Sequence, residues 1–197
     1  MATSLIDLRH ARNSAPDDLP RLQAYLAQLI GEQFRLARVS YGDELTLHFG
    51  ELRPARSPKL KGRLFGTYIL GFRGSPWVLK SDKGSLALSA GIELHNLPNI
   101  GGKLIRKEEL ERDPLIQAGS RVVAAAVFPV EPVHGIGLQL QFSDGCSVLI
   151  LPTESDVDAP DDANLPEIAD WELLSPNGLL SAGPGPNWSF KPSSKSE

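Results

Sequence analysis

The chain has 197 residues and a mass of 21.3 kDa, enough for one compact domain or two small ones. Its 41% hydrophobic residues, 22% charged residues and formal net charge of −4 exclude a chain that is disordered throughout. A single cysteine, Cys146, excludes an intrachain disulfide, and the sequence shows neither a long apolar run nor a signal-peptide pattern, so we expect a cytoplasmic protein.

The first predicted element is a helix that follows a flexible N-terminus, residues 1–15. Apolar residues recur there at helical spacing and form one stripe: Leu22, Tyr25, Leu26, Leu29 and Ile30. Pro20 is tolerated in a first helical turn, and Gly31 is a typical residue after a last turn. We therefore expect a helix that ends before Gly31 and packs on a sheet.

From residue 33 onward the hydrophobic period changes to two, which is typical of strands with one buried face. Residues 33–49 predict a β-hairpin. Further strands are predicted at Leu64–Phe72, Trp77–Lys80 and Ser85–Leu94, separated by turn residues. The helix and this meander form the first predicted half, residues 16–95.

A connector, residues 96–114, is predicted to hold a short helix at 107–112 and to lead into a second half, residues 115–180. Strands are predicted there at 121–130, 138–142 and 147–151, with a final hairpin at 171–180. Asp144-Gly145 predicts a two-residue turn, which would pair Phe142 with Ser147, Leu140 with Leu149 and Leu138 with Leu151. Residues 181–197 have little apolar content and are expected to form a flexible tail, with Trp188 and Phe190 as its possible anchors.

The two halves resemble each other. Residues 45–49 (LTLHF) match 138–142 (LQLQF), and residues 68–70 match 171–173 less closely. Chance likeness between alternating strands is the other explanation. We predict a mostly β (α+β) protein in which two related antiparallel β-meanders form a sandwich or barrel-like body, with one N-terminal helix and a short mid-chain helix.

A motif Leu-x-Leu-x-Phe-Ser-Asp-Gly spans Leu138 to Gly145, and an apolar strand, an acidic loop and a Trp-x-Leu segment with a Pro/Gly turn follow it, Trp171 to Gly178. This arrangement resembles a group of small uncharacterised bacterial proteins, some of which resemble immunity proteins of toxin systems. The resemblance covers the C-terminal third and reaches the first half only through the repeat. It implies no catalytic residues.

Two segments carry opposite charge. Five bases and one acid lie between residues 51 and 63, and seven acids and no base lie between residues 154 and 170. We expect partner-binding residues in both segments: Glu154, Asp156, Asp158, Asp161, Asp162, Arg53, Arg56, Lys59 and Lys61. Each segment follows the second strand of its half in the repeat alignment, so they could also contact each other. Two solvated loops are the simplest alternative.

The sequence predicts no catalytic residue, no cofactor and no metal site. The histidines are scattered without metal-ligand spacing, and no nucleophile or phosphate-loop motif is present. One weaker candidate is a cleft between the two halves lined by His48, Glu93 and His95.

These observations favour a non-catalytic protein-binding module, of an immunity-like or regulatory kind, that engages a basic partner such as a toxin or an assembly subunit through the acidic loop. Nucleic acid is not expected as a partner, because the chain is negative and few aromatic residues accompany the basic loop. One alternative is an enzyme or small-ligand binder that uses the cleft between the halves. Another is a structural subunit of a larger assembly, with Trp77, Trp171 or Trp188 as exposed interface anchors.

Overall fold

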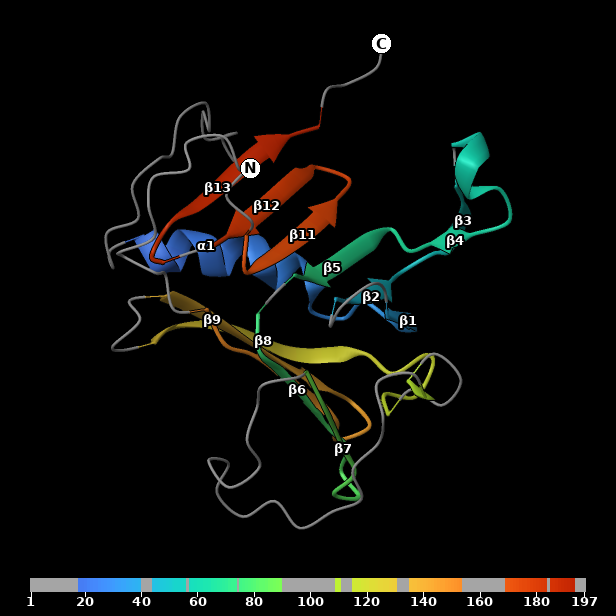
Figure 1. Cartoon of the computed structure of the whole chain (residues 1–197), viewed down its shortest axis with the longest axis horizontal. Coiled ribbons are helices and arrows are strands. Elements are labelled where there is room, and N and C mark those ends of the chain that lie inside the picture. Colours follow the sequence, from blue (N-terminus) through green and yellow to red (C-terminus); the bar gives the residue numbers. More distant parts are fainter. Residues whose placement is uncertain are drawn as a thin grey trace, which may run out of the picture.

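Two antiparallel sheets and one helix make up the computed structural model, an α+β sandwich (Figure 1). The structure describes residues 18–39, 44–55, 57–73, 75–89, 109–110, 115–130, 135–153, 169–183 and 185–193. Each main sheet has two edge strands, so the described strands form a sandwich and not a closed barrel. No helix in these ranges combines the length and apolar character that crossing a bilayer requires.

The two main sheets hold eleven of the strands. In order across the six-stranded sheet these are β1 (Phe34–Val39), β2 (Leu45–Phe49), β5 (Tyr68–Phe72), β11 (Trp171–Ser175), β12 (Gly178–Ala182) and β13 (Trp188–Pro192). Across the five-stranded sheet they are β7 (Leu86–Leu88), β6 (Trp77–Lys80), β10 (Ser147–Ile150), β9 (Gly135–Phe142) and β8 (Val122–Val130). The two remaining strands, β3 (Arg53–Pro54) and β4 (Leu64–Phe65), pair only with each other.

The two halves of the chain exchange strands between the sheets. The first half places β1, β2 and β5 in the six-stranded sheet and then crosses over to add β6 and β7 to the other. The second half does the reverse: it places β8, β9 and β10 in the five-stranded sheet and then adds β11 and β12 to the six-stranded sheet. Strand order therefore matches β6 with β11. The sequence match of residues 68–70 with 171–173 links β5 with β11 instead, so it does not follow this strand order.

The start of β1 meets the start of β8, and this junction has local twofold symmetry. Gly31 N–H donates to Val122 O at 2.8 Å, and Gly119 N–H donates to Phe34 O at 2.8 Å. Gly119 lies 88 positions after Gly31, and Val122 lies 88 positions after Phe34. Each bond therefore becomes the other when every residue is replaced by its counterpart in the other half, as happens across the twofold axis of a symmetric dimer.

The same shift relates other features of the junction. An isolated bridge pairs Gln33 with Arg121, its own counterpart 88 positions later. Gly31 and Gly119 both have left-handed backbones, with φ of 89° and 91°. The pairing of β1 with β2 and that of β8 with β9 each contain an irregularity in the corresponding place, after Phe34 and after Val122.

The predicted N-terminal helix is present as α1 (Leu19–Leu26) and continues as a single 3₁₀ turn, η2 (Ala27–Leu29). Leu22, Leu26 and Leu29 are fully buried, but Ile30 is 50% exposed, because the chain has left the helical spacing there. Gln23 of α1 bonds the backbone of β8 like a neighbouring strand, donating to Ala125 O and accepting from Val127 N. The helix thus covers part of a sheet edge.

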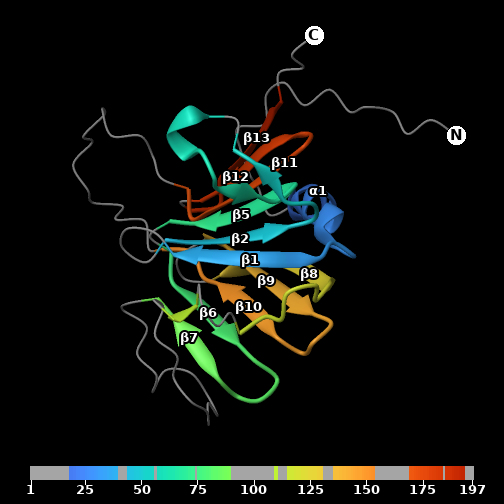
Figure 2. The same ribbon diagram turned by 90° about the vertical axis from the view of Figure 1, so that its right-hand side faces the viewer.

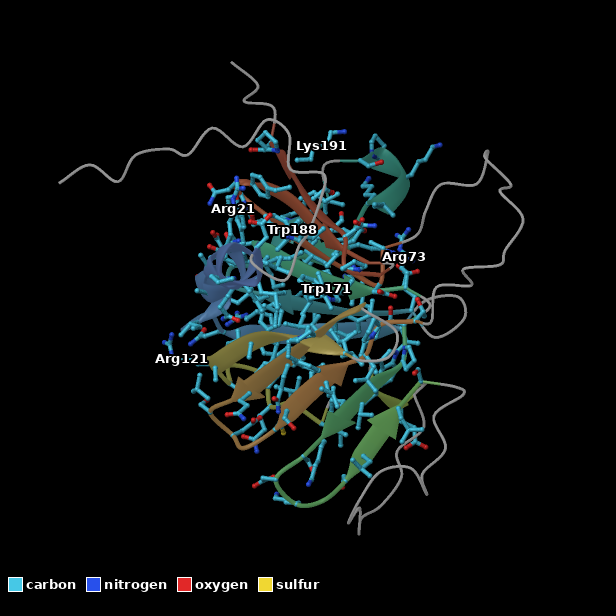
Figure 3. The ribbon with its side chains drawn as sticks, turned by 90° about the vertical axis from the view of Figure 1, so that its left-hand side faces the viewer. Arg21, Arg73, Arg121, Trp171, Trp188 and Lys191 are labelled. Carbon is cyan, nitrogen blue, oxygen red and sulfur yellow. The ribbon has the colours of Figure 1, made fainter. Side chains whose placement is uncertain are left out.

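The core lies between the sheets, and all three tryptophans belong to it. Figure 3 labels two of them, Trp171 and Trp188. Trp77 and Trp171 are fully buried, and each begins the strand that follows a crossover. Trp188 is 4% exposed and packs edge-on against Tyr25 of α1, with ring centroids 6.0 Å apart. The alternative of a structural subunit required exposed tryptophan anchors, and none of the three rings is exposed, since all supply apolar area to the core.

The C-terminal segment also differs from the flexible tail expected from its composition. Residues 188–192 form β13, which pairs along its full length with β12. Phe190 stacks on Tyr25 with centroids 4.6 Å apart. Two aromatic side chains at strand spacing are enough to dock this otherwise polar segment on the helix.

The turn between β9 and β10 has three residues instead of the expected two. Phe142 N–H donates to Cys146 O, and Gly145 adopts φ of 83°, as in a turn closed by a left-handed glycine. Leu140 consequently pairs with Val148. The expected pairs Phe142–Ser147, Leu140–Leu149 and Leu138–Leu151 are wrong by one position. That single step buries Val148 and Ile150 in place of their leucine neighbours.

The predicted mid-chain helix lies largely outside the described residues. Of the connector, the structure describes residues 109 and 110, and Leu110 is fully buried. Ile116 is also fully buried, so the connector returns to the core before β8 begins.

Candidate functional site

The basic segment forms a small folded unit that projects from the body beyond β2 and β5 (Figures 1 and 2). We call residues 53–65 the flap. It consists of β3, a single 3₁₀ turn η3 (Pro58–Leu60) and β4. A further bond, from Ala55 N–H to Arg63 O at 2.9 Å, extends the pairing of β3 with β4. The proline at the start of η3 and Gly62, with φ of 85°, suit a compact turn here.

His48 and Arg38 anchor the flap to the outer face of the six-stranded sheet. Gly66 N–H, directly after β4, donates to Nδ1 of His48 at 3.2 Å. The ring of Phe65 lies 5.6 Å from the ring of His48 and 4.9 Å beneath the Arg38 guanidinium. Arg38 also donates from Nη2 to Leu64 O at 2.6 Å. The flap is therefore held in one orientation by hydrogen bonds and by ring packing.

His48 is buried beneath the flap and does not face a cleft. Its side chain points away from the core, in line with the strand alternation, yet the residue is only 1% exposed. Burial, helped by the positive charge of Arg38, lowers the pKa of His48 from 6.5 to about 4. The neutral ring accepts the Gly66 bond at Nδ1, so its proton is on Nε2. Glu93 and His95, the other predicted cleft residues, lie outside the described residues.

The lowered pKa predicts that acid destabilises this protein partly through His48. Between pH 6.5 and about 4 the unfolded chain binds a proton at His48 that the folded chain does not. Stability therefore falls over that interval as the pH falls, by on the order of 3 kcal/mol from this residue. Urea unfolding at pH 7 and pH 4.5 should show a smaller loss for His48→Gln, since glutamine does not titrate. Equal losses in the two proteins would contradict the assignment.

The outer surface of the flap carries the basic residues. The side chains of Arg53, Lys59, Lys61 and Arg63 are all exposed, and Arg53 forms an ion pair of 2.7 Å with Glu51. Arg56 lies outside the described residues. Leu60 and Leu64 are 38% and 41% exposed among these bases. Three of the four described bases in the flap thus have no acidic partner within the described part of the chain.

The acidic residues Glu154, Asp156, Asp158, Asp161 and Asp162 all lie outside the described residues. The structure does describe Thr153, directly before the acidic segment (residues 154–170), and Asp170, its last residue, and a hydrogen-bonded cluster joins these two. Asp170 is 1% exposed, and its Oδ1 accepts bonds from Thr153 N at 3.0 Å and from Thr153 Oγ1 at 2.6 Å. Ser75 Oγ lies 2.6 Å from Asp170 O and 3.0 Å from Oδ1.

This cluster was not predicted, because its three members are far apart in sequence and match no motif. Ser75 belongs to the crossover from β5 to β6, whereas Thr153 and Asp170 belong to the crossover from β10 to β11. The two crossovers therefore touch. The cluster attaches Thr153, directly before the acidic segment, and Asp170, its last residue, to a buried point on the sandwich.

The two charged segments do not occupy equivalent places, contrary to the repeat alignment. The flap lies between β2 and β5, and its counterpart in the second half is the tight turn between β9 and β10. The acidic segment lies between β10 and β11, and its counterpart is the crossover at residues 73–76. The flap leads into β5 at Tyr68, and the acidic segment leads into the neighbouring strand β11 at Trp171. Trp171 pairs with Phe72, at the other end of β5, so the two segments enter this strand pair from opposite ends.

A shallow recess of about 540 Å³ lies where the two halves meet. Charged residues of both signs line it, among them Glu32, Arg35, Glu51 and Arg121. Arg121 donates to Gly31 O at 2.7 Å, and Arg35 donates to the Gln33 side chain at 3.2 Å. His48 is not part of this recess.

The environment of Cys146 keeps its thiol protonated. Burial, together with nearby Asp144, raises the pKa of the Cys146 thiol to about 12, and the thiol donates to Leu115 O at 3.1 Å. Within the described ranges, no three His, Cys, Asp or Glu side chains are grouped so that they could hold a metal ion.

No family model, no curated protein and no solved structure matches this chain.

Proposed function

We propose that this chain is a non-catalytic protein-binding module, of an immunity-like or regulatory kind, that engages a basic partner through its acidic segment. One observation carries the proposal: the fold makes the same crossover twice, and only one of the two is long. The crossover from β5 to β6 uses four residues, 73–76, whereas that from β10 to β11 uses twenty, 151–170. The architecture thus closes without the acidic segment.

The exchanged strands and the symmetric junction favour an origin of the two halves by duplication. If the halves arose by duplication, a segment that is present in one half and absent at the corresponding place of the other is an addition. Two additions are evident, the flap in the first half and the acidic segment in the second. Long connections in compact domains usually serve a function or are disordered. The charge of this one favours a function in binding.

The charge distribution supports a basic partner. The acidic segment contains seven acids and no base, whereas the chain as a whole has a net charge of −4, which leaves +3 for all other residues. A concentrated negative segment on a nearly neutral body attracts a positive surface and orients it before contact. The buried Asp170 cluster holds together Thr153, directly before the segment, and the last residue of the segment, and a chain whose two points of attachment are fixed loses less entropy on binding.

Small-ligand binding, with or without catalysis, is the alternative proposal. The recess at the junction of the halves favours it, because Arg35 and Arg121 reach it from different halves of the chain. A role as a structural subunit loses its main argument, since the tryptophans that were expected to anchor it are buried.

The proposal predicts that the acids are required for binding and dispensable for folding. Reversal of Asp156, Asp158, Asp161 and Asp162 to Lys should abolish capture of a basic protein from the source cell by the immobilised chain. The melting temperature should change by no more than about 2 °C, because the corresponding crossover from β5 to β6 closes the fold with four residues and none of these acids. Affinity capture with mass spectrometry and thermal unfolding measure the two effects.

A pair of variants with equal change in charge controls for non-specific electrostatics. Asp161→Lys with Asp162→Lys should weaken capture, whereas Asp82→Lys with Glu109→Lys, at exposed acids elsewhere, should not. Unchanged capture by the fourfold variant, or equal weakening by the two pairs, would reject the acidic segment as the binding surface.

A further inference from the structure

The tip of the flap presents six consecutive exposed residues, 59–64, with the sequence Lys-Leu-Lys-Gly-Arg-Leu. Bases alternate there with leucines, a pattern that in a strand would bury one face. Here neither face is buried: Leu60 and Leu64 are exposed together with Lys59, Lys61 and Arg63. The apolar positions of this pattern therefore have no partner that would explain them within the described part of the chain.

The flap is also rigidly presented, which distinguishes it from a solvated charge run. Phe65 is inserted between His48 and Arg38, and two backbone groups, Gly66 N–H and Leu64 O, are bonded to those side chains. Everything that anchors the flap lies at its base, and the six tip residues contribute nothing to the anchoring beyond Leu64 O. A preorganised surface loses little entropy when it binds.

We infer that residues 59–64 of the flap form a second binding surface, which takes an acidic segment of a partner protein that also carries apolar side chains. Carboxylates would pair with Lys59, Lys61 and Arg63, and apolar side chains would cover Leu60 and Leu64. This surface is separate from the acidic segment of the proposed function and opposite to it in charge. The inference does not depend on that proposal.

The structure favours a protein partner over nucleic acid. Single-stranded nucleic acid is bound on exposed aromatic rings beside the bases. The aromatic residues nearest the flap are turned inward, because Phe65 packs on His48 and Tyr68 packs against the core. With no ring to stack a base, and with the chain negative overall, the bases and leucines match an acidic peptide better.

The test uses the full chain and a fluorescein-labelled peptide of alternating Glu and Leu, followed by fluorescence anisotropy. We expect saturable binding that weakens about tenfold when Lys59 and Lys61 are both changed to Glu, because two attractions become repulsions. Leu60→Ser should weaken it by about threefold through lost apolar contact. The matched pair Lys80→Glu with Lys83→Glu, exposed bases elsewhere, should change it by less than about twofold.

Any one of the following results would overturn the inference. Equal weakening by the two lysine pairs would show an effect of net charge alone. Equally tight binding of a peptide with Gln in place of Glu would remove the role of the bases, and no effect of Leu60→Ser would remove that of the leucine. Tighter binding of a single-stranded oligonucleotide or of phosphatidylserine vesicles would assign the surface to another partner class.

The two proposals fail separately. The fourfold Lys variant of the acidic segment keeps all flap residues, so it should bind the peptide at least as well as the natural chain does. Loss of capture of a basic protein with intact peptide binding would support both surfaces. Loss of peptide binding in that variant would reject the flap as an independent site.

Discussion

Trp171→Ala is expected to lower the free energy of unfolding by about 3–5 kcal/mol, the largest effect of any single substitution proposed for this chain. The side chain is fully buried at the start of β11, opposite Phe72 of β5 (Figure 3). Its Nε1–H donates to Ile136 O at 3.0 Å, which joins the six-stranded sheet to the five-stranded one. The alanine variant therefore loses core area and leaves a carbonyl unpaired between the sheets.

Urea unfolding at neutral pH measures this loss of stability. Two further variants separate the contribution of the hydrogen bond from that of ring burial and provide an exposed control. Trp171→Phe keeps most of the ring but loses the hydrogen bond, so it should cost about 1–3 kcal/mol. Leu174→Ala, three residues later in the same strand and 46% exposed, should cost less than about 1 kcal/mol. A Trp171→Ala variant within about 1 kcal/mol of the natural chain would show that this ring does not join the sheets.

Gly66→Ala is expected to cost about 2–3 kcal/mol and to detach the flap. A Cβ at this position would lie 2.5 Å from Phe49 O, 2.7 Å from Phe49 N and 2.9 Å from Tyr68 O. These atoms belong to the backbones of β2 and β5, which cannot move without breaking the sheet. Relief must come from displacement of residue 66, and with it the bond to His48.

Hydrogen exchange of the amide at position 66 and tryptic cleavage within the flap both report detachment, and both should accelerate. Gly71→Ala in β5 is the matched control, because its Cβ would meet only Thr46 Cγ2 at an ordinary 3.6 Å. That variant should change stability by less than about 1 kcal/mol. Equal behaviour of the two variants would contradict the close approach at Gly66.

Much of the secondary structure could be predicted from local patterns. The helix with its end before Gly31, the hairpin at residues 33–49 and the strands on either side of Gly145 all follow from hydrophobic period and turn residues. The predicted strand pairing was wrong where a local sequence pattern is compatible with two turn lengths. Asp144-Gly145 suits a two-residue turn and a three-residue turn alike, and the choice moved the whole strand pairing by one position.

The candidate surfaces were predicted as charge and not as geometry. Counting acids and bases located the two charged segments, because long solvated loops keep their charge whatever the fold. Charge counts do not show that the packing of Phe65 on His48 holds the flap in place. Nor do they show that Asp170, one of the seven acids, is buried and hydrogen-bonded to Thr153 and Ser75. Those contacts join residues 17 to 95 positions apart, or depend on which face of a strand is covered.

Hydrophobic period, turn residues and charge are enough to predict a mostly β protein with one helix, two charged segments of opposite sign and a weak likeness between its halves. They do not predict that each half divides its strands between both sheets, or that the halves meet at the Gln33–Arg121 bridge. Hydrophobic period specifies which side chains of a strand are buried, whereas the pairing of a strand with its neighbour uses backbone groups that are the same in every strand. In the folded chain the two crossovers correspond, and the one from β10 to β11 is longer because it contains the acidic segment.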